Sequence, residues 1–96
     1  MVFNKDYFEK IFENNDPWGY STSEYEKVKY VRQIEAINKY LPEPKKILEI
    51  GCAEGLFTQI LASTFPEAEV LSLDISALAV ERAKKNCESY GNVICI

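Results

Sequence analysis

The fold is decided by residues 46–55, which read KILEIGCAEG. A short apolar run, residues 46–50, ends at Gly51, and a second glycine, Gly55, precedes a segment with helical periodicity. An apolar run of this length that is bounded by glycine is typical of a buried strand. Two glycines after a strand allow a tight turn and let the backbone approach a bound ligand closely. The stretch therefore predicts a strand, a glycine loop and a helix, in that order.

The same alternation continues toward the C-terminus. Residues 56–64 are expected to form a helix and residues 70–74 a second strand. A further helix over residues 77–88, with Ser76 as its N-cap, leads to a third strand over residues 92–96. Such an order with short connections forms parallel strands with right-handed crossovers. The sequence therefore predicts an α/β fold with a Rossmann-like βαβαβ parallel sheet, the first half of a doubly wound fold.

Two helices are expected before this unit. The first covers residues 3–12. The second begins at Ser21 or Ser23, because each serine is followed three residues later by a glutamate, which is the spacing of a capping box. We therefore divide the chain into an N-terminal helical segment, residues 1–44, and an α/β domain, residues 45–96.

Composition excludes several functional classes. The 96 residues carry a net charge of −4 and no cluster of lysine and arginine, so nucleic-acid binding is not expected. No apolar run approaches the roughly 20 residues that span a bilayer, and the N-terminus lacks the apolar core of a signal peptide. The chain has no histidine, and its three cysteines show no C-x-x-C spacing, so neither a metal site nor a disulfide framework is expected. We expect a cytoplasmic protein with reduced thiols.

The glycine loop does not fit two well-known nucleotide motifs. The dinucleotide fingerprint requires glycine where Ala53 stands, and glycine or alanine where Leu56 stands. The P-loop requires a Gly-Lys-Ser/Thr sequence, which does not follow. A nicotinamide-dependent oxidoreductase therefore remains an alternative that these two residues disfavour.

The loop instead has an acid, Glu49, two residues before Gly51. This arrangement resembles the first motif of class I S-adenosylmethionine-dependent methyltransferases, usually Glu/Asp-x-Gly-x-Gly-x-Gly. Glu49, Gly51 and Gly55 match the motif, and Ala53 stands at its middle glycine. In that family the acid lies near the loop and the cationic methionine end of the cofactor. The resemblance implies that S-adenosylmethionine binds at Glu49 and at Gly51, Cys52, Ala53 and Gly55. The alternative is that Glu49 only caps the loop backbone.

A second acid, Asp74, ends the second expected strand, roughly 20 residues after the loop, where dinucleotide folds hold a ribose. A carboxylate has two oxygens and can accept hydrogen bonds from both ribose hydroxyls. In the resembled family the next residue, here Ile75, packs on the adenine. The alternatives are that Asp74 is a helix cap and that Ile75 is an ordinary core residue.

The N-terminal segment carries a narrower resemblance. It reads DPW at residues 16–18, then YE at residues 25–26 and KY at residues 29–30, which is similar to the start of methyltransferases like nodulation protein S. In that group the leading helices form a lid over the cofactor, which implies that Trp18, and with it the tyrosines at 25 and 30, close over the site. Aromatic residues at helical spacing also suit a core. The same resemblance implies a small-molecule methyl acceptor. It points to an amine on a small molecule or on a sugar as the group that is methylated.

The resemblance also implies what residues 45–96 lack. They supply three strands of the order 3-2-1-4-5, so they would be a truncated S-adenosylmethionine-binding domain with its first strand at an open edge. In the family, the residues that bind the acceptor follow later strands than these three. We therefore name no catalytic residue. An open strand edge is a template for another chain, and we expect self-association or pairing with a partner chain. A non-catalytic split chain that acts through such a partner is a second functional alternative.

Overall fold

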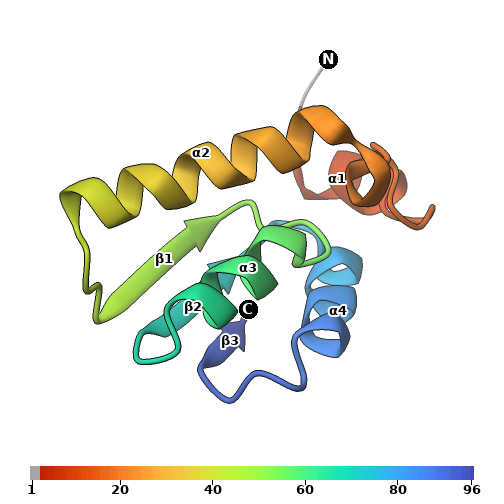
Figure 1. The fold of residues 1–96 in the computed structure, drawn as a ribbon. Coiled ribbons are helices and arrows are strands. Elements are labelled where there is room, and N and C mark those ends of the chain that lie inside the picture. The colour runs from red at the N-terminus through yellow and green to blue at the C-terminus, as the bar shows by residue number, and fades with distance from the viewer. Residues whose placement is uncertain (1–2) are drawn as a thin grey trace.

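The computed structural model describes residues 3–96. Within these residues the chain forms a three-stranded sheet, four α-helices and one 3-10 helix (Figure 1). The elements follow in the order α1 (Lys5–Ile11), η1 (Tyr20–Thr22), α2 (Glu24–Tyr40), β1 (Lys46–Ile50), α3 (Leu56–Thr64), β2 (Glu69–Leu73), α4 (Ala77–Asn86) and β3 (Val93–Cys95). The α/β class, the βαβαβ order and the two preceding helices are confirmed.

The sheet is parallel and has the order β1-β2-β3, so β1 lies at an edge as expected. Ile47 of β1 is in register with Val70 of β2, and Val70 with Val93 of β3. The carboxyl ends of β1 and β2 therefore lie side by side, which is where ligands bind in open α/β sheets.

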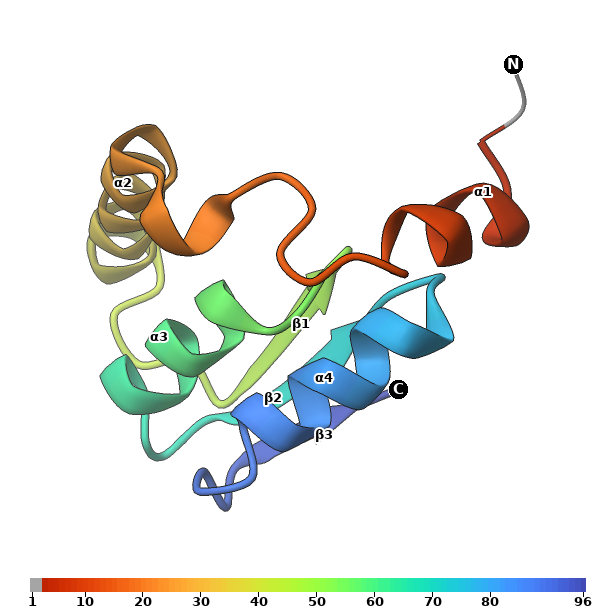
Figure 2. The same cartoon turned by 90° about the vertical axis from the view of Figure 1, so that its right-hand side faces the viewer.

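The two faces of the sheet are covered differently. α3 and α4 lie on one face (Figure 2), where Val70 and Ser72 are fully buried. On the opposite face Leu48, Ile50 and Ile94 are exposed. This alternation follows from the pleat, which points successive side chains to opposite faces. Within residues 3–96, helices cover only the first face.

The N-terminal helices attach to the α/β unit at two places. Ile34 and Ile37 of α2 pack against the core that Leu61 and Val70 help to form. At the other end, the Glu9 carboxylate of α1 accepts a hydrogen bond of 3.2 Å from the Leu78 amide in the first turn of α4. Both N-terminal helices therefore contact parts of the α/β unit that lie far from them in the sequence (Figure 1).

Helix caps explain two of the helix boundaries. The Ser76 hydroxyl accepts a hydrogen bond from the Ala79 amide, which confirms the expected N-cap of α4. Of the two serines that could begin α2, the structure uses Ser23, whose hydroxyl accepts from the Glu26 amide. Ser21 bonds to Asp16 instead.

No helix within the described residues has both the length and the apolar character that a membrane span requires.

Candidate cofactor site

The glycine loop connects β1 to α3 through an unusual backbone. Three of its residues have positive φ angles: Gly51 at 78°, Ala53 at 50° and Gly55 at 86°. The amides of Gly51 and Cys52 both donate to the Leu73 carbonyl, at 2.8 and 2.9 Å, which attaches the loop to the end of β2. Left-handed conformations are ordinary for glycine but cost an alanine roughly 1 kcal/mol or more. Ala53 therefore occupies a strained position in which glycine would be relaxed.

The two loop glycines serve different purposes. A Cβ atom on Gly55 would lie 3.1 Å from the Ala83 Cβ and 3.2 Å from the Cys87 Sγ, so Gly55 permits the loop to pack on α4. A Cβ on Gly51 would meet nothing within 4 Å. Gly51 therefore leaves open space beside its backbone, where a ligand can approach.

Asp74 lies directly against this loop. Its Oδ2 accepts a hydrogen bond of 2.8 Å from the Ala53 amide, and its Oδ1 accepts one of 3.0 Å from the Ser76 amide. The carboxylate therefore supports the loop at its strained residue and the turn into α4. Each carboxylate oxygen has two lone pairs, so both retain capacity for a ligand hydroxyl.

Ile75 lies beside Asp74 and is half exposed, so it is not an ordinary core residue.

Glu49 reaches the site from β1. Its Oε1 accepts hydrogen bonds from the hydroxyl of Ser72, at 2.8 Å, and from that of Thr58. Ser72 and Thr58 are fully buried, and their hydroxyls hold the carboxylate in place. The hydrogen-bond donors to Glu49 are thus side-chain hydroxyls. They are not the loop amides that the backbone-capping alternative requires.

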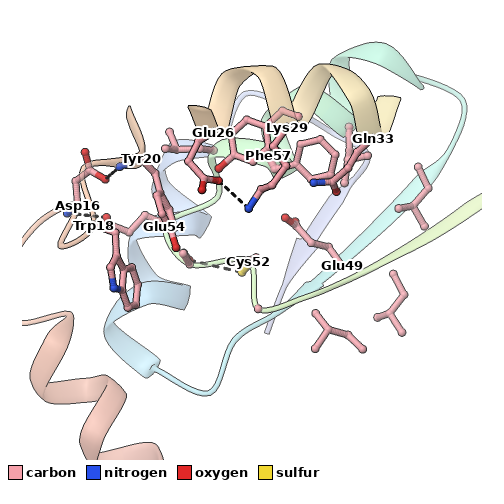
Figure 3. A pocket seen from close by; sticks show the side chains of 18 of the residues that line it. Asp16, Trp18, Tyr20, Glu26, Lys29, Gln33, Glu49, Cys52, Glu54 and Phe57 are labelled. Carbon is pink, nitrogen blue, oxygen red and sulfur yellow. Dashed lines mark hydrogen bonds and ion pairs between the residues drawn. The ribbon is translucent and has the colours of Figure 1, made fainter. Parts of the chain in front are cut away.

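Cavities of similar size lie on the two sides of the loop. The first, of about 440 Å³, lies between α2, β1 and the loop, and we call it the α2 cavity (Figure 3). The second, of about 450 Å³, includes Ile75, Asp74 and Phe8, and we call it the Ile75 cavity. The residues that border both are Phe12, Trp18, Tyr20, Ile50, Gly51 and Ala53. An elongated ligand that passes Gly51 can therefore reach both cavities.

Trp18 belongs to an aromatic cluster at this junction. Its ring stacks on Tyr20, with centroids 5.5 Å apart and an angle of 20°, and meets Phe12 edge-on at 5.2 Å. Trp18 is still 44% exposed, so part of its ring is free to contact a ligand. Tyr30 also borders the α2 cavity, where it stacks on Phe57, whereas Tyr25 is 75% exposed and borders neither cavity.

Cys52 borders the α2 cavity, and its amide helps to attach the loop to the end of β2. Its side chain is buried with Val80, Ala83 and Cys95. Burial raises the pKa of the Cys52 thiol to about 12, so it stays protonated and unreactive at neutral pH. All three cysteines of the chain are free and buried.

Glu54 is a residue that the sequence did not indicate. Its Oε1 accepts a hydrogen bond of 2.7 Å from the Asp16 amide, and its Oε2 lies 3.2 Å from Arg82 Nη1 of α4. Arg82 also donates to the Asn14 carbonyl at 3.1 Å. Glu54 therefore connects the glycine loop to the segment that carries Trp18, and both to α4.

The sequence profile of the nodulation protein S (NodS) family matches residues 2–96. The chain belongs to the nodulation protein S family. Its resemblance to the class I methyltransferases of the nodulation protein S type is thereby confirmed. A curated member of this family, nodulation protein S of Bradyrhizobium diazoefficiens, is 29% identical over 91 residues, which are 94% of this chain and 42% of that protein.

Other similar proteins are methyltransferases by name. Malonyl-[acyl-carrier protein] O-methyltransferase of Priestia megaterium is 30% identical over 96 residues, covering 98% of this chain and 35% of that protein. The crystal structure of the N-methyltransferase NodS from Bradyrhizobium japonicum WM9, in complex with S-adenosyl-L-homocysteine, superposes with a TM-score of 0.81 at 23% identity. It covers 98% of this chain and 47% of that one. The chain thus spans less than half the length of these relatives.

Proposed function

We propose that this chain forms the S-adenosylmethionine-binding part of a methyltransferase. The observation that carries the proposal is the meeting of Glu49, Gly51 and Asp74 at one loop with a cavity on each side. Further support comes from relatives that are methyltransferases by name and from a solved NodS structure that contains S-adenosyl-L-homocysteine.

The proposed placement of the cofactor follows from the two cavities. The adenosine end lies in the Ile75 cavity, with the ribose hydroxyls donating to Asp74 and the adenine packed on Ile75. The chain of the cofactor passes Gly51, where a side chain would otherwise occupy the open space. The methionine end lies in the α2 cavity, where the carboxylate of Glu49 attracts its ammonium group. Cys52 and Ala53 border this path with their backbone, and Gly55 supports it by its packing.

We further propose that residues 1–44 act as a helical lid. Trp18 borders both cavities and therefore lies where it can cover the middle of the cofactor. The hydrogen bond from the Asp16 amide to Glu54 attaches this covering segment to the loop that it covers. A covered site excludes water, which strengthens electrostatic contacts within it.

The chemistry needs few groups from this part of the protein. The cofactor supplies an electrophilic methyl group on a sulfonium, and transfer depends mainly on alignment of an acceptor with that methyl. Glu49, the loop and Trp18 hold and shield the reactive end. For the acceptor we propose a small molecule with an amine, because the solved relative NodS is an N-methyltransferase by name. The net charge of −4 disfavours nucleic acid as the acceptor.

Calorimetric titration distinguishes this function from the oxidoreductase alternative. S-adenosyl-L-homocysteine should bind the chain at least about tenfold more tightly than NADH, a difference of about 1.4 kcal/mol. The reason is that Ala53 and Leu56 replace the glycines and small residues that a dinucleotide loop needs. Equal or tighter binding of NADH contradicts the proposal.

A further inference from the structure

The wall of the α2 cavity that faces the loop carries polar side chains from α2. Glu26, Lys29 and Gln33 border the cavity from consecutive turns of this helix. Their spacing of three and four residues places them on one face. Figure 3 shows the Lys29 side chain pointing from α2 into the cavity, on the side where Glu49 lies. The function proposed above assigns no role to these residues.

Lys29 is held by a nearly buried acid. Its Nζ lies 3.0 Å from Glu26 Oε2, and the Glu26 side chain is only 11% exposed, whereas that of Lys29 is 47% exposed. The hydrogen bond to Glu26 raises the pKa of Lys29, so the ammonium stays charged. An ammonium has three N–H donors, and Glu26 accepts one of them. The other two remain for a ligand.

The charges around the cavity restrict where an anionic ligand group can lie. Four acids border the α2 cavity (Asp16, Glu26, Glu49 and Glu54), and among the described residues Lys29 is the only lysine or arginine that does. A ligand carboxylate next to an acid is repelled, whereas next to a lysine it forms a charge-assisted hydrogen bond. Lys29 is therefore the place in this cavity that suits a carboxylate.

We propose that Lys29 binds the carboxylate of the amino-acid end of the cofactor and that Glu26 positions it. Glu49 and Lys29 then face the ammonium and the carboxylate of one zwitterion, from β1 and from α2. This inference rests on the proposed function, because it concerns the same ligand. Under this proposal α2 is part of the binding site as well as a cover over it.

Two ligands distinguish the contact of Lys29 with the ligand carboxylate from the contacts made by the rest of the site. S-adenosyl-L-homocysteine has the amino-acid end, and 5′-methylthioadenosine has the same adenosine and thioether but lacks that end. Lys29→Met should weaken binding of the first by about 10- to 100-fold and leave binding of the second unchanged in calorimetry. Lys29→Arg, which keeps the cation, should lose less.

Lys27→Met is the matched control. Lys27 pairs with Glu24 at the same three-residue spacing, with 3.4 Å between Nζ and Oε1, but it does not border the α2 cavity. The control should bind both ligands as the unchanged chain does. The inference is overturned if Lys29→Met leaves the binding of S-adenosyl-L-homocysteine unaltered. It is also overturned if the substitution weakens the binding of both ligands equally. If the unchanged chain binds neither ligand, the proposed function itself fails.

Discussion

Asp74→Ala is expected to weaken binding of S-adenosyl-L-homocysteine by roughly 10- to 100-fold, because two charge-assisted hydrogen bonds to the ribose are lost. The same substitution removes the acceptors of the Ala53 and Ser76 amides. We therefore also expect a loss of about 1–3 kcal/mol in the free energy of unfolding. Calorimetry measures the first effect and chemical denaturation the second.

Two further variants separate these effects. Asp74→Asn keeps one carbonyl oxygen for the Ala53 amide, so it should lose less stability while still weakening ribose binding. Glu81→Ala removes an equal charge from an exposed position of α4 and should change neither quantity. If Asp74→Ala binds the ligand normally and stays folded, Asp74 serves only to support the loop and the turn into α4.

Gly55→Ala is expected to cost about 2–4 kcal/mol of stability, since a left-handed alanine is strained and its Cβ would also overlap α4. Gly51→Ala should cost only the strain, about 1–2 kcal/mol, because space is open beside it. It should instead weaken ligand binding, since the added methyl occupies the path between the two cavities. Denaturation curves and calorimetry on both variants give the comparison.

Ala53→Gly completes this series in the opposite direction. It places glycine at a φ of 50° and removes the strain that alanine carries there. We expect unchanged or slightly higher stability, because the greater freedom of glycine in the unfolded chain offsets part of the gain.

The roles assigned to the two glycines are wrong if Gly51→Ala destabilises the chain more than Gly55→Ala does.

The framework of the fold could be predicted from the sequence because local patterns determine it. The apolar runs at residues 46–50 and 70–74 coincide with β1 and β2 to within one residue, and Ser76 caps α4 as expected. The meeting of the loop with Asp74 followed from parallel strand order, since adjacent strands end at the same edge of a sheet. The third strand is shorter than expected, at Val93–Cys95.

The parts of the site that could not be predicted depend on contacts between distant residues. Glu54 occupies a variable position of the loop motif, and its role appears only when Asp16 and Arg82 come beside it. Lys29 is one of several lysines on α2, and only the fold distinguishes it from Lys27. The family resemblance placed Tyr25 in the lid, but this side chain of α2 is exposed to solvent. Helical spacing alone does not determine which side of α2 faces the loop.

Amide NMR spectra of the chain titrated with S-adenosyl-L-homocysteine test most directly whether the cofactor lies across Gly51. Signals of Gly51, Ala53 and Ile75, together with the indole N–H of Trp18, should shift as the ligand saturates. Gly91, which borders neither cavity, should not. Shifts confined to one side of the loop, or saturation that leaves Gly51 and Trp18 unchanged, would contradict a cofactor that joins the two cavities.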